Sequence, residues 1–177
     1  GVVKESGIAR LSIDVQSPWG EGNITSKLTG AFNVSNLLAS LSVLCLSGVE
    51  FENSLKLLSE LEAVPGRMEC FTKNARPRVI VDYAHTPDAL EKSLASLRDI
   101  SSGKLICVVG CGGDRDQGKR PMMGKLAETY ADQVILTNDN PRNEKPESII
   151  NQMLAGMEQS ASVVVIPDRA AAISEAI

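Results

Sequence analysis

The first part of the chain changes from an alternating to a helical pattern of apolar residues. Residues 8–15 (IARLSIDV) alternate apolar and polar side chains, which is typical of a half-buried strand. Residues 17–23 (SPWGEGN) are expected to form a turn-rich loop. From Asn33 onward apolar residues recur on one helical face, and Gly48 stands where a C-terminal cap glycine belongs. That apolar stripe consists of Val34, Leu37, Leu38, Leu41, Leu44 and Cys45.

A second helix is predicted over residues 52–61, with Leu55, Leu58 and Leu61 facing inward. The Val-Pro-Gly sequence at residues 64–66 then interrupts the pattern, because proline and glycine are the strongest local breakers of regular structure. We therefore expect one domain over residues 1–64 and a second over residues 65–177.

The second part of the chain alternates strands with helices. Thr86 is a suitable N-cap and Pro87 a suitable first helical residue. The expected strands cover residues 78–83, 104–110, 133–139 and 162–167, and the expected helices cover residues 87–99, 119–131, 146–156 and 168–177. Continuous Val/Ile runs separated by helices indicate an α/β fold whose parallel sheet is covered on both faces. Ligands in such folds bind at the carboxyl ends of the strands.

The composition and net charge exclude some classes of binding partner. Of the 177 residues 43% are apolar and only 3% are aromatic, and the formal net charge is −4, so neither a nucleic-acid platform nor an anionic membrane surface is an expected partner. The longest apolar segment, residues 37–46, is too short to span a bilayer and contains Ser40 and Ser42. No signal peptide opens the chain, which also lacks an initiator Met, and its last helix reads as interrupted. We therefore expect a fragment of a cytoplasmic protein.

The cysteines do not predict a zinc site. Cys45, Cys70, Cys107 and Cys111 lie in apolar contexts and have no paired CxxC spacing. Reduced thiols within the core are the expected interpretation.

Three predicted strand ends carry residues suited to chemistry. The first is residues 82–87 (DYAHTP), where His85, the only histidine, precedes a helix N-terminus. A phosphate or ribose there would meet the imidazole and the helix amides together. The alternative is a loop histidine bonded to backbone.

The second strand end is the glycine-rich segment over residues 110–120 (GCGGDRDQGKR). Gly113 to Lys119 fits the spacing of a phosphate-binding loop, but the next residue is Arg120 instead of the Ser or Thr that such a loop needs for magnesium. A dinucleotide GxGxxG fails because Arg115 occupies its last glycine position. The loop instead sets Arg115, Lys119 and Arg120 against Asp114 and Asp116, which suits a zwitterionic substrate. The alternative is a solvated loop with internal ion pairs.

The third strand end is residues 137–142 (TNDNPR). Pro141 stiffens the turn, so that Arg142 and Asp139 would point in fixed directions. A guanidinium can clasp a carboxylate through two parallel hydrogen bonds, while Asp139 or Asn140 could accept from an ammonium. The alternative is an ordinary turn with an exposed arginine.

Two polar pairs in the first half are also candidates. Asn33 and Asn36 stand one helical turn apart, so their amides could face a ligand, although Asn33 could simply cap the helix. Arg67 and Glu69 follow the expected boundary and could bridge the domains, contact a ligand or form a surface pair.

Taken together, several motifs resemble those of one family. LTGAFNVSN, VPGRME, VDYAHTPDALEKSL, VVGCGGDRDQGKRPMMG and TNDNPR occur in this order in UDP-N-acetylmuramyl-tripeptide synthetases of the Mur ligase family. The resemblance runs from about Trp19 to Arg169, and the DNPR sequence is similar to the signature of the members that add meso-diaminopimelate.

The resemblance implies a fold and a set of site residues. Residues 1–64 would end a central ATPase domain, and residues 65–177 would form an incomplete, Rossmann-like amino-acid-binding domain. ATP would lie near Asn33, Asn36, Arg67, Asp82 and His85, and meso-diaminopimelate near Arg115, Asp139, Asn140, Pro141 and Arg142. No residue of this chain is expected to be catalytic itself or to bind a metal directly.

The resemblance also implies a reaction. ATP, with Mg²⁺, would phosphorylate the terminal carboxylate of UDP-N-acetylmuramoyl-L-alanyl-D-glutamate, and the diaminopimelate amine would displace phosphate from the acyl phosphate. The family's phosphate loop, carbamylated lysine and Gly-Lys-Gly-His-Glu loop are absent from this sequence. We therefore expect the 177-residue chain alone to be inactive. A monomer is the expected oligomeric state. The alternatives are a folylpolyglutamate-synthase-like ligase, which adds glutamate, and a non-catalytic Rossmann-like binding module.

Overall fold

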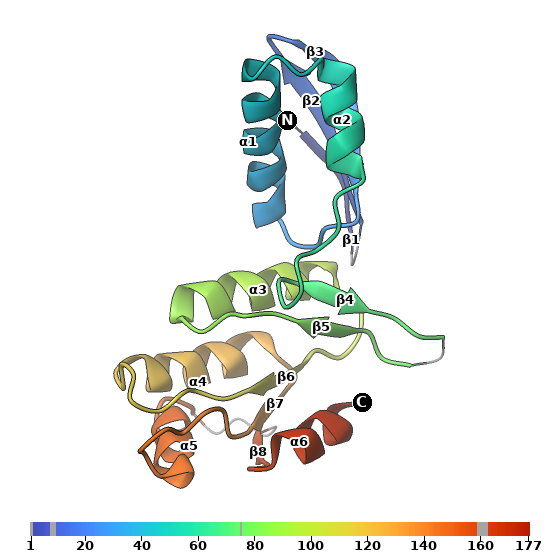
Figure 1. Cartoon of the computed structure of the whole chain (residues 1–177). Coiled ribbons are helices and arrows are strands. Elements are labelled where there is room, and N and C mark those ends of the chain that lie inside the picture. The colour runs from blue at the N-terminus through green and yellow to red at the C-terminus, as the bar shows by residue number, and fades with distance from the viewer. Residues whose placement is uncertain (1, 8–9, 75, 159–162) are drawn as a thin grey trace. The chain divides into compact units, whose positions relative to one another are not determined.

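The computed structural model describes residues 2–7, 10–74, 76–158 and 163–177. The chain forms two compact units, one reaching Tyr83 and the other starting at Ala84 (Figure 1). The boundary expected between residues 64 and 65 stays a prediction.

The first unit is built on an antiparallel sheet in the order β1-β2-β3, formed by Val2–Gly7, Arg10–Ser17 and Gly20–Ser26. The strand expected over residues 8–15 is β2, although residues 8–9 lie outside the described residues. The loop expected over residues 17–23 is wrong, because only a tight turn separates β2 from β3. The glycines in that segment serve packing: a Cβ at Gly22 would clash with the side chain of Leu55.

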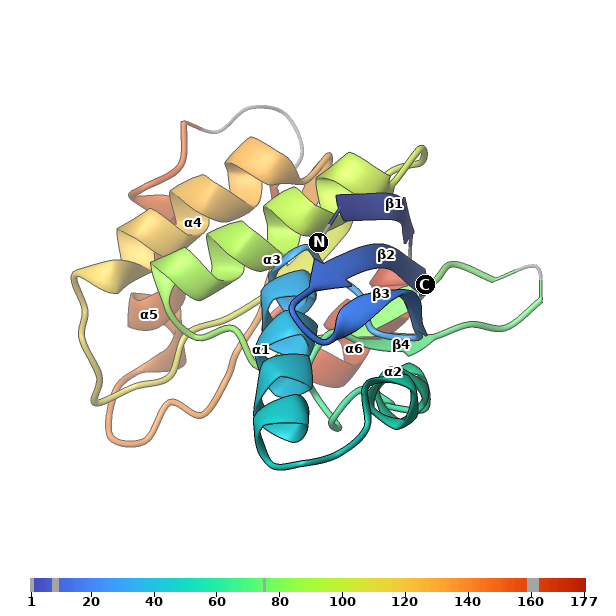
Figure 2. The same ribbon diagram turned by 90° about the horizontal axis from the view of Figure 1, so that it is seen from above.

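Two helices cover one face of this sheet, α1 (Phe32–Leu46) and α2 (Phe51–Ser59), as Figures 1 and 2 both show. The predicted stripe is confirmed, since Leu37, Leu41 and Cys45 are buried against the sheet. Gly48 has a φ of 89° directly after the helix, as its expected capping role requires. The second helix ends earlier than predicted, so Leu61 lies beyond it and is 43% exposed.

A hairpin of β4 (Glu69–Phe71) and β5 (Val79–Val81) completes the first unit. Residues 78–83 were expected to form a buried strand of the parallel sheet, and this expectation is wrong. β5 pairs with β4 in antiparallel orientation, and Val81 is 43% exposed. A short apolar run does not by itself specify its partner strand, which explains the error.

The second unit contains a parallel sheet in the order β6-β7-β8, formed by Ile106–Val109, Gln133–Leu136 and Val163–Val165. Its helices are α3 (Pro87–Ile100), α4 (Lys119–Tyr130), α5 (Pro146–Leu154) and α6 (Arg169–Ala176). These elements match the predicted alternation, except that residue 162 lies outside the described residues. Thr86 caps α3 as expected, its hydroxyl accepting a 3.3 Å hydrogen bond from the amide of Ala89.

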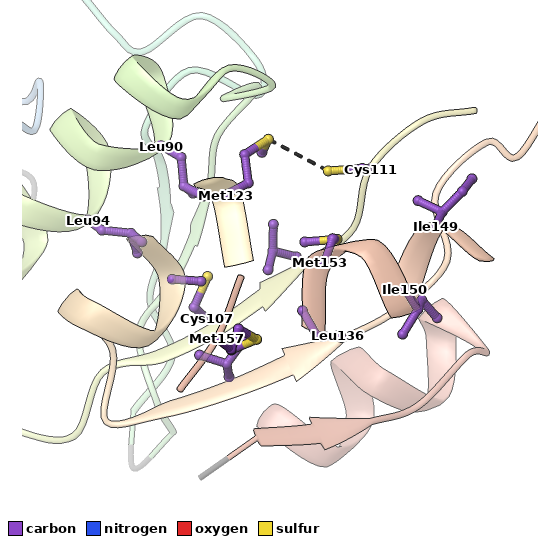
Figure 3. Packing of buried hydrophobic residues seen from close by; sticks show 13 residues of the cluster. Leu90, Leu94, Cys107, Cys111, Met123, Leu136, Ile149, Ile150, Met153 and Met157 are labelled. Atoms are coloured by element: carbon purple, nitrogen blue, oxygen red, sulfur yellow. Dashed lines mark hydrogen bonds between the residues drawn. The ribbon is translucent and has the colours of Figure 1, made fainter. Parts of the chain in front are cut away.

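The core of the second unit lies between the sheet and helices α3, α4 and α5 (Figure 3). It buries Leu90, Met123, Leu136 and Met153 together, and Cys111 contacts the sulfur of Met123 at 3.6 Å. Helix α6 contacts β6 and β7 and buries Ala172. The segments that leave the carboxyl ends of β6 and β7 carry the candidate site. Among the described residues no helix is long and apolar enough to cross a membrane.

Candidate functional site

Two loops leave the carboxyl ends of β6 and β7 and lie against each other. The first covers residues 110–118 and the second residues 137–145. The amide of Gly113 donates a 2.8 Å hydrogen bond to the carbonyl of Asn140, and the amide of Thr137 donates one of 3.0 Å to Val109. Parallel strands place their ends at one edge of the sheet, and these two loops therefore meet there.

The glycines of the first loop make this close approach possible. A Cβ added at Gly110 would lie closer than 3.0 Å to the carbonyl oxygen of Thr137, and one at Gly113 would do the same to that of Pro141. At Gly112 an added Cβ would stand 2.9 Å from Nη1 of Arg142. The glycine-rich sequence thus fits backbone against backbone, a role different from the nucleotide loops rejected above.

Arg142 is held at the centre of this contact. Its Nη1 donates a 2.7 Å hydrogen bond to the carbonyl of Gly113, and its amide donates one of 3.1 Å to Oδ1 of Asn140. Its φ is 49°, a conformation that a non-glycine residue rarely adopts. In the described part of the chain its Nε and Nη2 have no hydrogen bond. The hydrogen bond from Nη1 to Gly113 therefore orients the guanidinium, whose other two nitrogens keep their donors for a ligand.

The neighbouring predicted residues differ in how firmly they are held. Oδ1 of Asp139 accepts a 2.8 Å hydrogen bond from the amide of Asn140, while its other oxygen has no partner within the described ranges. Pro141 carries the carbonyl against which Gly113 packs. Arg115 is exposed and forms no ion pair with any described residue. The structure thus brings residues 139–142 against residues 112–114 and leaves the Arg115 side chain in solvent.

Of the other two cations of the first loop, Arg120 is not exposed toward a substrate as expected, whereas the expectation for Lys119 stays a prediction. Arg120 is fully buried and forms an ion pair with Glu144, its Nη2 lying 2.7 Å from Oε1 and its Nη1 2.8 Å from Oε2. Lys119 donates a 2.7 Å hydrogen bond to the carbonyl of His85. The Arg120 side chain is therefore not available to a substrate, because it is buried and paired, whereas Lys119 is tied to the backbone through one of its three donors.

Glu144 is the residue that the sequence interpretation missed. The bidentate hydrogen bonds from Arg120, together with that from the amide of Asp114, lower the pKa of its carboxyl to about 2. Asp114 itself, with a φ of 51°, accepts a 2.7 Å hydrogen bond from the side chain of Asn143. The only signal in the sequence is an acidic residue two positions after Arg142, which does not reveal its partner.

The candidate ATP residues of the first unit form two local groups. At the start of α1, Nδ2 of Asn36 donates a 3.1 Å hydrogen bond to Oδ1 of Asn33. The side-chain Nδ2 of Asn33 in turn donates a 2.7 Å hydrogen bond to the carbonyl of Thr29. The two side-chain amides are therefore bonded to each other, and their contact with a ligand stays a prediction. The alternative role for Asn33 is wrong, since Ala31 is the N-cap residue.

The second group surrounds the start of β4. The guanidinium carbon of Arg67 lies 4.5 Å from the centre of the Tyr83 ring, a cation–π contact. Oδ2 of Asp82 accepts a 2.9 Å hydrogen bond from the amide of Met68. Glu69 accepts one of 2.8 Å from the amide of Gly66 and does not pair with Arg67. Asp82 thus shapes the backbone beside Arg67.

His85, the remaining candidate, belongs to the second unit and is exposed. Within the described ranges no three acidic, histidine or cysteine side chains gather as they would around a metal ion.

Comparison with known proteins identifies the class. A sequence model of the family described as "Mur ligase, glutamate ligase domain" matches residues 66–177, and the chain therefore belongs to the Mur ligase family. It is 57% identical over 167 residues to the UDP-N-acetylmuramoyl-L-alanyl-D-glutamate–2,6-diaminopimelate ligase of Coxiella burnetii, a match that covers 94% of this chain and 34% of that protein. The chain thus spans about a third of that relative.

Solved structures agree with this assignment. A 2,6-diaminopimelate ligase structure matches over 98% of this chain and 36% of its own, with 39% identity and a TM-score of 0.68. The folylpolyglutamate synthase of Thermotoga maritima matches over 97% of this chain and 40% of its own, with a TM-score of 0.77 but only 23% identity. The second likeness shows a shared fold alone. The resemblance stated from the motifs is confirmed at the level of the family.

Proposed function

We propose that this chain is the amino-acid-binding part of an ATP-dependent ligase. The complete enzyme would add meso-diaminopimelate to UDP-N-acetylmuramoyl-L-alanyl-D-glutamate in peptidoglycan precursor synthesis. The name of the Coxiella relative supports the substrate. The observation that carries the proposal is Arg142, whose guanidinium is anchored to Gly113 through Nη1 while its other nitrogens keep their donors.

In this proposal the amino acid is held by complementary charges at one of its ends. The free N–H groups of Arg142 clasp a carboxylate, with Arg115 as a second cation. The unpartnered oxygen of Asp139 accepts from an ammonium. Oδ1 of Asn140 already accepts from the Arg142 amide, which leaves its amide nitrogen to donate to the carboxylate. Pro141 keeps this turn stiff.

The chemical consequence is orientation. With one end of the diaminopimelate clasped, its reacting amine is held near an acyl phosphate made from the dipeptide carboxylate and ATP. The amine forms the new C–N bond, and phosphate leaves with the electron pair of the broken C–O bond. Fixing two reactants in this way lowers the entropic part of the barrier. Mg²⁺ would enter with ATP and stabilise the charge of the transferring phosphoryl group. Among the described residues no cluster of metal ligands is found.

We propose Asn33, Asn36, Arg67 and Asp82 of the first unit as ATP-binding residues, and His85 of the second unit as a further one. The exposed Asn36 and the cationic Arg67, already stacked on an aromatic ring, suit an adenine and a phosphate respectively. A cytoplasmic location and a monomeric state stay predictions.

The test is a comparison of amino acids with the complete gene product that contains this chain. Phosphate release would be measured with the UDP-dipeptide, ATP, Mg²⁺ and either meso-diaminopimelate, lysine or glutamate. We expect turnover with meso-diaminopimelate alone. Preference for glutamate would favour the folylpolyglutamate-synthase-like alternative. Absence of turnover with every amino acid would favour the non-catalytic module.

A further inference from the structure

The buried ion pair between Arg120 and Glu144 ties together all the segments that surround the candidate site. Arg120 is the second residue of α4, and Glu144 lies two residues before the start of α5. The two oxygens of Glu144 accept from both terminal nitrogens of Arg120, and Oε1 also accepts a 2.6 Å hydrogen bond from the amide of Asp114. One carboxylate therefore connects the second loop to the first loop and to α4.

Arg120 extends this network in two further directions. Its Nη1 donates a 2.7 Å hydrogen bond to Oε1 of Gln152 on α5, and its Nη2 donates one of 3.2 Å to the carbonyl of Gly112. Gly112 precedes Gly113, the residue whose carbonyl orients Arg142. Arg120 thus binds the backbone at Gly112, and Glu144 binds it at Asp114, on the two sides of the Gly113 carbonyl.

Arg142 lies between two fixed points of its own loop. On one side Asn140 is bonded to Gly113, and on the other Glu144 is bonded to Arg120. A residue with a φ of 49° keeps that conformation only where its surroundings impose it. The fixed points on both sides explain how Arg142 is kept in this conformation.

Stability alone does not account for a pair of this kind. The arginine side chain is fully buried, and the side chain of Glu144 is 18% exposed. Replacing a buried ion pair by packed apolar side chains is often neutral or stabilising, whereas buried ionic groups in some proteins specify one geometry. Apart from the hydrogen bond to Gln152 on α5, the contacts of this pair lie on the segments that orient Arg142.

We propose that Arg120 and Glu144 are positioning residues for the amino-acid site, which act by keeping the guanidinium of Arg142 in its binding orientation. The inference rests on the proposed function, because it assumes that Arg142 binds the incoming amino acid. It assigns the pair no contact with substrate. The expected consequence of loosening the pair is weaker use of the amino acid with unchanged use of ATP and of the UDP-dipeptide.

The experiment uses Glu144→Gln and Arg120→Lys in the complete gene product. Each change keeps most of the side-chain volume but weakens the two-pronged, charge-assisted contact. We expect the KM for meso-diaminopimelate to rise roughly tenfold to hundredfold, in the range expected when a hydrogen bond to a charged group is lost. The KM values for ATP and for the UDP-dipeptide should stay at the parent value.

The matched control is the ion pair between Arg98 and Asp132, which lies at the opposite end of β7. Its Nη1 to Oδ2 distance is 2.7 Å, and Asp132 also accepts a 2.7 Å hydrogen bond from a backbone amide, that of Leu105. Asp132→Asn should lower the melting temperature and leave the KM for the amino acid unchanged. A purely structural role for the Arg120–Glu144 pair would give the same pattern for both pairs and would overturn the inference.

A double-mutant cycle tests whether the pair acts through Arg142. In an Arg142→Ala background, Glu144→Gln should have no further effect on the KM for the amino acid, because the group that it positions is gone. Additive effects would overturn the inference, and so would failure of both single variants to fold, since the pair would then be required for the fold itself. An enzyme in which Arg142→Ala alone changes no amino-acid parameter would instead refute the proposed function.

Discussion

The carbonyl oxygen of Gly113 accepts a 2.7 Å hydrogen bond from Nη1 of Arg142, across two loops whose residues stand 29 positions apart in the sequence. This bond uses one nitrogen of the guanidinium and leaves the others for a ligand. It also requires a glycine beside it, because a Cβ at Gly112 would stand 2.9 Å from the same nitrogen.

Arg142→Ala should reduce the efficiency of amino-acid use. Removing a charge-assisted pair with a carboxylate is expected to cost about 2–3 kcal/mol of transition-state binding. The measurement is kcat/KM for meso-diaminopimelate in the complete gene product. Arg76→Ala is the control, since Arg76 is exposed and its side chain has no described partner. Equal kcat/KM values for both variants would contradict a role of Arg142 in binding.

Gly113→Ala should destabilise the second unit and disturb the site together. The new Cβ would collide with the carbonyl oxygen of Pro141, which belongs to backbone and cannot swing away. Overpacking of this kind costs about 1–3 kcal/mol, read from denaturant unfolding. Gly103→Ala is the matched control, because a Cβ there meets nothing within 4 Å. A Gly113→Ala protein as stable as the control would show that the two loops can move apart.

Acid should weaken the Arg120–Glu144 pair within a defined range. The pKa of Glu144 is lowered from its ordinary value of 4.5 to about 2, chiefly by hydrogen bonds from Arg120. A folded-state pKa below the unfolded one means that the carboxylate stabilises the fold above about pH 4.5. That contribution disappears as the pH falls through about 2. Urea unfolding at pH 7, 5, 4 and 3 should therefore show a steeper loss for the parent than for Glu144→Gln. Parallel curves would contradict the assignment.

The cysteines should differ in their reactivity toward alkylating reagents. Burial raises the pKa of the Cys107 thiol to about 12, and burial is also the main cause of the raised pKa of Cys111. Cys70 is only partly buried. Iodoacetamide at neutral pH, followed by peptide mapping, should label Cys70 before Cys107 and Cys111, because the thiolate is the reacting form. Preferential labelling of Cys107 would mean that the core of the second unit opens readily.

The 177-residue chain by itself should release no phosphate from ATP in the presence of meso-diaminopimelate and the UDP-dipeptide. Its GxxxxGK segment ends in Lys119 and is followed by Arg120, which is buried and paired with Glu144, where a phosphate-binding loop needs a Ser or Thr hydroxyl. A malachite-green assay with the purified chain provides the measurement, and the complete gene product serves as the positive control. Turnover by the isolated chain would refute this prediction.

Much of the second unit could be predicted from local sequence. Apolar runs of strand length, separated by segments with helical period, indicated β6, β7 and β8 with their helices, and Thr86 and Pro87 indicated the start of α3. The first unit was predicted less well. Gly20 and Gly22 resemble turn residues, yet they belong to β3, where they make room for Phe51 and Leu55 of α2.

Family membership and the candidate residues at the strand ends followed from the sequence alone, because order of motifs and periodicity are local, linear properties. Which charges remain available to a ligand was decided by the tertiary structure. The sequence presents Arg115, Arg120 and Arg142 alike, as arginines after a strand end. In the fold, however, Arg120 is buried and paired with Glu144, 24 positions away. Arg142 is oriented by one hydrogen bond to the carbonyl of Gly113 and keeps its other donors. Burial and pairing depend on contacts between distant segments, and no local pattern encodes them.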